Sequence, residues 1–363
     1  MLQSNCLVNA FTMEVAILKI EKEPFGKIGE HKVEKYTLTN NQNVSISVLN
    51  YGGIWQGFYV PDTHGGRVNL ILGSDNLQTY VDTASLCAGR IIGRTAGRIG
   101  GGEFDIDGKH YQVDQNEGKN CLHGGSHGLG ENFWDVKTSE GPNLAQIILT
   151  TTITHKQDTF PANEKIQVAY TLNESNTVTI DFVGESDGTT LFNPTNHTYW
   201  NLSGEAKTIQ GHILQINSTT HLEVDDGKIP TGRKLLNEGT PFDFSNPTVL
   251  GTALQEMQNT KEGGFDDIWV VEPSNYIADQ PIATLMDAAT GRKIKMYSDR
   301  NGLVAYTANG LHIKGYNRPA NPWFAIALEG QTLPDTPHHP SFGDISLRPE
   351  QPRHYQLRYE YFA

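Results

Sequence analysis

The chain has 363 residues and a formal net charge of −13 at pH 7, with hydrophobic side chains at 37% of its positions. An acidic chain without a Lys/Arg-rich run is unsuited to nucleic acid, because phosphate groups must be neutralised by basic patches. No apolar stretch is long enough to cross a bilayer, so the composition favours a soluble protein whose partner is a neutral small molecule rather than a membrane or a polyanion.

The amino-terminal segment and the cysteines indicate the compartment. Residues 1–23 lack the basic start and the sustained apolar core of a secretory signal peptide. The three cysteines form neither a CxxC motif nor a disulfide framework, so we expect a cytoplasmic protein. Met13 is a second possible start, which would make residues 1–13 an extension of the domain.

Strand patterns follow along the chain. Residues 44–49 alternate polar and apolar side chains, as a half-buried strand does. Residues 103–113 predict a hairpin around the turn Asp107-Gly108, and the β-branched run at 145–154 predicts a strand. Further strands are expected at 166–172 with 177–182, at 282–287 with 292–298, and at 355–361.

Helical patterns are scarce. Glycine and proline are frequent, at 37 and 17 residues, which predicts many turns and few long helices. Residues 248–254 predict one short helix, and no helices alternate regularly with strands, which argues against a parallel α/β sheet. Without a repeat or a low-complexity linker, we expect a single domain over 1–363, all-β and built as one large antiparallel β-sandwich.

One histidine and one glutamate are candidates for an acid–base pair. His197 lies among polar and aromatic neighbours in the decapeptide 193–202, and histidine is the side chain whose unperturbed pKa lies nearest neutrality. Residues 323–328 predict a buried strand that runs into Glu329, where a carboxylate needs a role or a partner. Taken singly, each residue also has an ordinary structural interpretation.

The decapeptide as a whole, NPTNHTYWNL, resembles the signature of the aldose 1-epimerases, or galactose mutarotases, in which Asn-His-x-Tyr-Phe/Trp-Asn-Leu carries the catalytic histidine. Further blocks that resemble this family follow in its order from Gly89 to Pro349. The resemblance implies a galactose mutarotase-like supersandwich. It also implies interconversion of the α and β anomers of a free aldose of the galactose/glucose class, without a metal or another cofactor.

The resemblance also implies catalytic roles. Ring opening needs a base for the C1 hydroxyl proton and an acid for the ring oxygen. Glu329 stands in a block similar to the family's Glu-x-Gln-x-x-Pro-Asp, which implies that it is the base, with His197 as the acid. His123, in Asn-Cys-Leu-His-Gly-Gly, is implied to assist near the ring oxygen.

Sugar contacts are implied at Arg98, Asp266 and Tyr199. Arg98 matches the last arginine of the family's Gly-Arg-x-Ala-Asn-Arg-Ile, and Asp266 matches its Gly-Phe-Asp. Gly97 and Val304 depart from the family, because they stand where its members usually offer amide side chains. The sugar subsite is therefore expected to differ more than the chemistry.

Two other groups of residues have alternative interpretations. Trp200 and Trp323 either stack on a sugar face or belong to the core. A metal site would have to gather five histidines whose spacing lacks a Cys/Asp framework, so no metal is expected. These histidines are His123, His127, His197, His338 and His339.

Alternative functions remain open at this stage. The same fold could act on a disaccharide or a hexose 6-phosphate, and the phosphate would need arginines such as Arg90 and Arg94 at the rim. A non-catalytic sugar-binding module would not need both His197 and Glu329. A β-sandwich glycosidase would use two carboxylates, which Asp266 and Glu329 could supply. The pattern indicates no particular oligomeric state.

Overall fold

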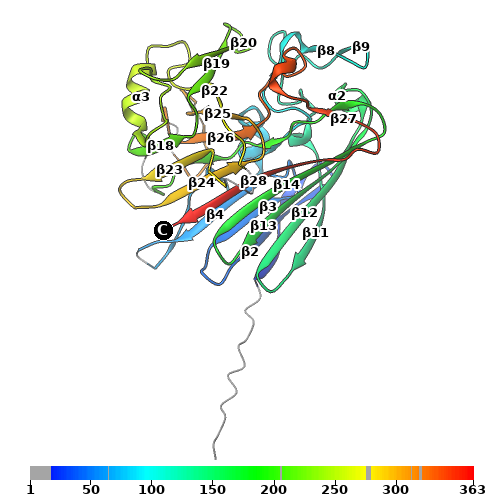
Figure 1. Ribbon diagram of the computed structural model, residues 1–363. Coiled ribbons are helices and arrows are strands. Elements are labelled where there is room, and N and C mark those ends of the chain that lie inside the picture. Colours follow the sequence, from blue (N-terminus) through cyan, green and yellow to red (C-terminus); the bar gives the residue numbers. More distant parts are fainter. Residues whose placement is uncertain (1–17, 64, 205–206, 275–278, 312, 319–320) are drawn as a thin grey trace, which may run out of the picture.

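The computed structural model describes residues 18–63, 65–204, 207–274, 279–311, 313–318 and 321–363. Antiparallel strands dominate these residues and only short helices accompany them (Figure 1). The predicted all-β fold is therefore confirmed. The extension predicted at 1–13 lies outside the described residues.

The largest sheet has nine strands, in the order β11-β12-β13-β14-β28-β24-β23-β18-β21. Its strands are β11 (Asp135–Glu140), β12 (Leu144–Ile153), β13 (Glu164–Asn173), β14 (Thr177–Ser186), β18 (His212–Ile216), β21 (Thr248–Val249), β23 (Ala283–Asp287), β24 (Lys293–Ser298) and β28 (Arg353–Phe362). The strand predicted at 145–154, the two hairpins and the carboxyl-terminal strand all fall in this sheet and are confirmed.

A five-stranded sheet packs against it, in the order β1-β2-β3-β4-β5. Its strands are β1 (Lys19–Ile28), β2 (His31–Thr39), β3 (Ser45–Leu49), β4 (Trp55–Pro61) and β5 (Arg67–Asn69). Side chains of both sheets, such as Phe58 of β4 and Phe182 of β14, share one buried apolar cluster. β3 confirms the strand predicted at 44–49, and the two sheets form the predicted sandwich.

A six-stranded sheet, in the order β17-β26-β25-β22-β19-β20, carries the residues of interest (Figure 1). Its strands are β17 (Tyr199–Trp200), β19 (Thr220–Val224), β20 (Pro230–Leu236), β22 (Asp266–Val270), β25 (Gly302–Tyr306) and β26 (Ile326–Gln331). The strand predicted at 323–328 was placed too early. Trp323 has a φ of 59°, which is incompatible with a strand, so β26 starts at Ile326 and holds Glu329 inside it.

The remaining elements are short. Paired strands are β6 (Ile91–Ile92) with β16 (Thr195–Asn196), β7 (Arg98–Ile99) with β10 (Cys121–Leu122), β8 (Glu103–Ile106) with β9 (Lys109–Gln112), and β15 (Thr190–Leu191) with β27 (Ser346–Leu347). Helices are α1 (Leu77–Asp82), α2 (His155–Asp158), α3 (Leu250–Met257) and the 3₁₀ turns η1 (Ala84–Leu86), η2 (Gly100–Gly102), η3 (Leu129–Glu131) and η4 (Pro340–Phe342).

These short elements test two further predictions. The β8–β9 hairpin is confirmed, and both turn residues, Asp107 and Gly108, have positive φ, at 52° and 72°. The helix predicted at 248–254 begins only at Leu250, because Thr248 and Val249 pair with β18. Within the described residues, no helix is long and apolar enough to cross a membrane.

Candidate active site

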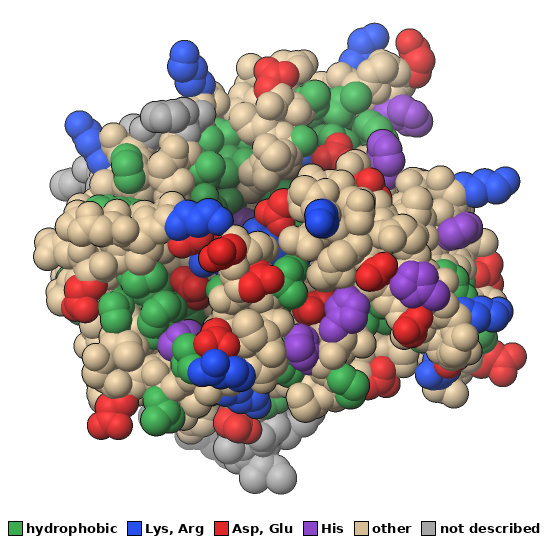
Figure 2. All heavy atoms as spheres, turned by 90° about the horizontal axis from the view of Figure 1, so that it is seen from above, with side chains coloured by type: hydrophobic (Ala, Val, Ile, Leu, Met, Phe, Trp, Pro, Cys, Tyr) green, Lys and Arg blue, Asp and Glu red, His purple; other side chains and the backbone are tan. Residues whose placement is uncertain are grey.

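A cavity of about 390 Å³ lies over one face of the six-stranded sheet. Glu329 of β26 pairs with Val304 of β25, and Asp266 of β22 pairs with Tyr306 of β25, so adjacent strands contribute these four side chains to its floor. His197 also lines the cavity, so both candidates for the acid–base pair lie at one site. Figure 2, a view from above, shows acidic, basic, histidine and hydrophobic side chains together on one face.

Buried polar side chains of the decapeptide hold it against β26. Thr195 Oγ1 donates a hydrogen bond to the carbonyl of Gly330 (2.9 Å). Asn193 Nδ2 and Asn201 Nδ2 donate to main-chain carbonyls just after and just before this strand, at 2.9 and 2.8 Å. These bonds fix the histidine segment to the strand that carries the glutamate, although the two lie far apart in the sequence.

His197 and Glu329 form a buried pair. His197 Nε2 lies 3.5 Å from Glu329 Oε1, and the residues are only 6% and 2% exposed. Among the described residues, His197 Nδ1 and Glu329 Oε2 have no hydrogen-bond partner. Such atoms are costly to bury unless a ligand supplies the partner. Burial raises the pKa of Glu329 to about 8, with a smaller contribution from Asp266, and burial lowers the pKa of His197 to about 4.

His123 lies edge-on to His197, with ring centroids 5.5 Å apart and an interplanar angle of 85°. The main-chain N–H of Gly97 donates to His123 Nδ1 (3.2 Å), which assigns the ring proton of the neutral imidazole to Nε2. Burial lowers the pKa of His123 well below its ordinary value, and the neighbouring His197 and Arg98 add to this effect. His123 is therefore a neutral hydrogen-bond donor at pH 7.

His123, His197 and Glu329 also have the composition of a metal site, since their donor atoms lie within 4.8 Å of one another. The hydrogen bond from Gly97 works against metal binding. Ligation through Nε2 of a neutral His123 would move the ring proton to Nδ1, where it would face the N–H of Gly97. The arrangement thus suits hydrogen bonding and proton transfer better than coordination.

The other histidines that the sequence analysis grouped with this pair lie elsewhere. His338 Nδ1 lies 2.7 Å from Asp335, and His339 contacts the same carboxylate at 3.7 Å. The carbonyl of His127 accepts a hydrogen bond from Gln157 (3.3 Å). Of the five histidines, the structure brings only His123 and His197 together around the cavity.

Charged side chains form one side of the cavity. Arg98 Nε and Nη2 donate to the carboxylate of Glu117 at 2.6 and 2.8 Å, and Arg98 Nη2 lies 3.7 Å from Asp266. Lys228 Nζ lies 3.3 Å from Asp267. Burial raises the pKa of Asp266, against the attraction of Arg98. Sequence reasoning missed Glu117 and Lys228, because neither stands in a motif or next to a predicted site residue.

The aromatic candidates have different positions. The Tyr199 ring lies 4.8 Å from the His197 ring and lines the cavity, while its hydroxyl donates to the carbonyl of Leu86 (3.0 Å). Tyr199 therefore supports the histidine and can meet a sugar only through its ring. Trp200 is fully buried in the core, and Trp323 Nε1 donates to the carbonyl of Gly263 (2.9 Å). Neither of these tryptophans lines the cavity, so they do not stack on a ligand there.

Gly97 is held at a φ of 72°, and a Cβ atom on it would lie 2.6 Å from Pro334 Cβ and 3.2 Å from Gln331 Nε2. Gln331 lines the cavity and is fully buried, and neither polar atom of its amide has a partner among the described residues. The motif that identified Glu329 also contains Gln331, but sequence reasoning gave it no role. Val304 and its neighbour Ile268 make the floor beside Glu329 apolar.

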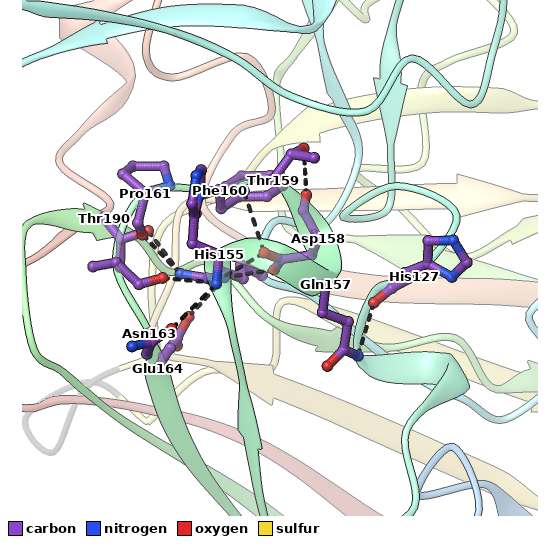
Figure 3. A network of polar contacts seen from close by, with 12 residues as sticks. His127, His155, Gln157, Asp158, Thr159, Phe160, Pro161, Asn163, Glu164 and Thr190 are labelled. Atoms are coloured by element: carbon purple, nitrogen blue, oxygen red, sulfur yellow. Dashed lines mark hydrogen bonds and ion pairs between the residues drawn. The ribbon is translucent and has the colours of Figure 1, made fainter.

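Arg90 and Arg94, which precede Arg98 in the same segment, do not face the cavity. Arg90 is 2% exposed and donates to the carbonyl of Tyr80 (2.9 Å). Arg94 is fully buried and donates twice to Asp158, at 2.6 and 2.9 Å, within the network that Figure 3 shows around Asp158, Glu164 and Thr190. The segment is thus anchored by buried arginines, which are not available at the rim of the cavity to bind a phosphate.

Comparisons with known proteins agree with this geometry. The family model described as Aldose 1-epimerase matches residues 34–360. The chain therefore belongs to the aldose 1-epimerase family, whose members are isomerases that interconvert the anomers of sugars. It is 38% identical over 350 residues to the maltose epimerase of Levilactobacillus brevis, covering 95% of this chain and 99% of that protein.

Two further relatives extend the likeness. The chain is 31% identical over 337 residues to the human galactose mutarotase, covering 91% of this chain and 95% of that protein. A solved aldose epimerase homologue from C. elegans superposes with a TM-score of 0.82 at 27% identity, covering 90% of this chain and 98% of that one. The expected family and fold are therefore confirmed.

Proposed function

We propose that anomer interconversion in this enzyme proceeds by ring opening and closure with Glu329 as base and His197 as acid. Glu329 takes the proton of the C1 hydroxyl while His197 protonates the ring oxygen, and the roles reverse when the ring closes on the other face. The observation that carries the proposal is the 3.5 Å contact of the two side chains, each of which has one atom without a hydrogen-bond partner among the described residues. Concerted transfer avoids both a free alkoxide and a free oxonium ion.

The pair holds one proton between about pH 4 and pH 8, given the pKa values of His197 and Glu329. Burial favours the uncharged arrangement of the empty cavity, with the proton on Glu329. A bound sugar stabilises the charged arrangement, in which Glu329 is a carboxylate and His197 an imidazolium. In that arrangement the sugar hydroxyl donates to the carboxylate and the ring oxygen accepts from the imidazolium. The Nε2–H of His123 is then free to donate to the ring oxygen. No step in this scheme needs a cofactor.

Arg98 and Asp266 are the proposed hydroxyl-binding groups. A carboxylate accepts two hydrogen bonds from vicinal hydroxyls, and Glu117 holds the guanidinium in a bidentate pair that fixes its orientation. We further propose that the protein acts in the cytoplasm as a single domain. Its cysteines at 87 and 121 are free, which fits a reducing compartment.

The first substrate candidate is a free hexose of the galactose/glucose class. A reducing disaccharide is the second, favoured by the cavity of about 390 Å³ and by the name of the maltose epimerase relative. A hexose 6-phosphate is disfavoured. Arg98 and Lys228 are already paired with carboxylates, and Arg90 and Arg94 are buried away from the cavity.

Polarimetry with fresh α-anomers of glucose, galactose and glucose 6-phosphate tests this proposal. We expect enzyme to accelerate the rotation change of the two free sugars well above the spontaneous rate, with little effect on the phosphate. No acceleration with any free aldose would contradict the proposal. Hydrolysis of an aryl glycoside would instead favour a glycosidase that uses Asp266 and Glu329 as its two carboxylates.

A further inference from the structure

The segment that follows β26 binds the main chain on both sides of Ile99. The main-chain N–H of Asp335 donates a hydrogen bond to the carbonyl of Arg98 (3.1 Å). The side-chain Oδ1 of Asp335 accepts a hydrogen bond from the N–H of Gly100 (2.9 Å). Asp335 therefore connects the strand that carries Glu329 to the short strand β7 that carries Arg98.

These contacts fix Arg98 at both of its ends. Glu117 binds the guanidinium through Nε and Nη2, at 2.6 and 2.8 Å, while Asp335 holds the main chain. Asp335 is only 4% exposed and does not line the cavity, although its neighbour Pro334 does. Asp335 does not reach a ligand in the cavity, so any effect that it has on sugar binding must pass through a residue that it positions.

His338 binds the same carboxylate. Its main-chain N–H donates to the carbonyl of Asp335 (3.0 Å), and this turn brings its ring back to the aspartate side chain. His338 Nδ1 lies 2.7 Å from Asp335 Oδ1, the oxygen that also accepts from Gly100. A hydrogen bond between two charged groups is stronger than one from a neutral donor. Protonated His338 therefore holds Asp335 more firmly than neutral His338 does.

The carboxylates around His338 favour its protonated form. The hydrogen bond to Asp335 raises the pKa of His338 above its ordinary value, burial opposes this rise, and Glu103 and Asp105 of β8 add to it. The His338 side chain is 37% exposed, so it can exchange its proton with solvent. Two further histidines contact these carboxylates at 3.1 to 3.7 Å, namely His110 and His339.

We propose that Asp335 and His338 are positioning residues that hold Arg98 in the orientation that binds a sugar hydroxyl. This inference rests on the function proposed above, in which Arg98 contacts the sugar. Loss of either contact loosens β7 and weakens the hydrogen bond to the sugar, while His197 and Glu329 keep their geometry. The effect falls mainly on KM rather than on kcat, and it depends on pH because His338 acts most strongly when it is protonated.

The test compares His338→Gln with the wild-type, full-length protein. Initial rates of mutarotation of fresh α-glucose, followed by polarimetry from pH 5.5 to pH 9, give kcat and KM. Glutamine can still donate to Asp335 but cannot carry a charge, so we expect KM to rise by about threefold at pH 5.5. The ratio of the two KM values should fall toward one as the pH rises and wild-type His338 loses its proton. Titration of Glu329 is common to both proteins and cancels in this ratio.

Asp335→Asn examines the connection to Arg98. Asparagine tolerates the φ of 58° at this position and can accept from Gly100, but it has no charge to attract His338. We expect kcat/KM to fall by about fivefold through KM. Combined with Arg98→Ala, the same substitution should cause no further loss, because its effect passes through Arg98. If Asp335→Asn fails to fold by circular dichroism, the more exposed His338→Gln decides the question alone.

His354→Gln is the matched control. His354 also pairs with an aspartate, Asp181, at 2.8 Å, but it belongs to β28 and does not line the cavity. Its kcat and KM should equal those of wild type. A KM ratio of one at every pH for His338→Gln would overturn the inference for His338. Additive losses in the double variant would show that Asp335 does not act through Arg98. If the wild type accelerates mutarotation of no free aldose, the proposed function fails and this inference fails with it.

Discussion

The main-chain N–H of Gly97 donates a hydrogen bond to Nδ1 of His123, at 3.2 Å. We therefore expect residue 97 to affect the reaction through its backbone, by fixing the ring proton of His123. The position is constrained, because its φ of 72° is one that L-residues rarely adopt and a Cβ atom would lie 2.6 Å from Pro334 Cβ.

Gly97→Asn would restore the amide that is usual in the family, but strain on the backbone opposes it. We expect kcat to fall, because the N–H moves away from His123 and the Nε2–H donor is no longer fixed. Gly97→Ala tests the strain alone. Steady-state kinetics on galactose separate the effects, and a Gly97→Asn enzyme with higher kcat/KM on galactose would show that the backbone tolerates the side chain.

Glu329→Gln keeps the shape and hydrogen bonding of the side chain but removes the basic carboxylate. We expect mutarotation to fall by at least about a hundredfold. The fold should persist, because a glutamine adds no charge to a site where Glu329 is 2% exposed. Circular dichroism checks the fold and polarimetry the rate. Near-normal turnover would remove Glu329 from the role of base.

His197→Asn should lower kcat more than it raises KM, since the imidazole is needed mainly in the transition state. Asparagine retains a hydrogen-bonding group but has no titratable proton near neutral pH. Isothermal titration with galactose gives the affinity independently of the rate. A variant that lost affinity and kept its kcat would show that His197 binds the sugar without transferring a proton.

The pH profile of kcat/KM should be bell-shaped, with limbs near 4 and 8. Below about pH 4 both His197 and Glu329 carry a proton, so the pair has no base. Above about pH 8 Glu329 has lost its proton while His197 is neutral, so the pair has no acid. Since kcat/KM reports on the free enzyme, the two limbs of the profile reflect the pKa values of the pair when no sugar is bound. A profile that is flat from pH 4 to pH 9 would contradict the one-proton pair.

The sequence motifs named His197 and Glu329 as a candidate acid–base pair, and the structure places the two side chains 3.5 Å apart. Local patterns do not show why the decapeptide is so rich in asparagine. Asn193 and Asn201 bind the main chain on either side of β26, a long-range contact that leaves no periodic signal. Glu117 and Lys228 were missed for the same reason, since their partners, Arg98 and Asp267, are distant in the sequence.

Element boundaries were harder to predict than element types. The apolar run at 323–328 looks like a strand throughout, but the backbone at Trp323 turns to a φ of 59° and its indole binds Gly263 instead. Similarly, Thr248 and Val249 extend the nine-stranded sheet before α3 begins at Leu250. In both places a tertiary contact overrides the local propensity.

Glu164 provides the last prediction, which concerns stability. All five N–H groups of Arg94 are used: two bonds go to Asp158, and the others to two main-chain carbonyls and Thr190. Glu164 is fully buried, and its Oε2 lies 3.6 Å from Arg94 Nε, but neither oxygen has a hydrogen-bond partner among the described residues. Burial raises the pKa of Glu164 from 4.5 to about 8, although Arg94 opposes the shift.

A raised pKa means that the folded protein holds this proton to a higher pH than the unfolded chain does. The stabilisation is complete below pH 4.5 and is lost as pH rises through about 8. Glu164→Gln cannot ionise, so its free energy of unfolding should decline less from pH 5 to pH 9, by on the order of a few kcal/mol relative to wild type. Urea unfolding at pH 5, 7 and 9 measures this difference, with Glu256→Gln on the exposed face of α3 as control. Asp158→Asn, which breaks the pair with Arg94, should destabilise at each of these pH values. Parallel pH dependence in wild type and Glu164→Gln would mean that Glu164 keeps one protonation state throughout.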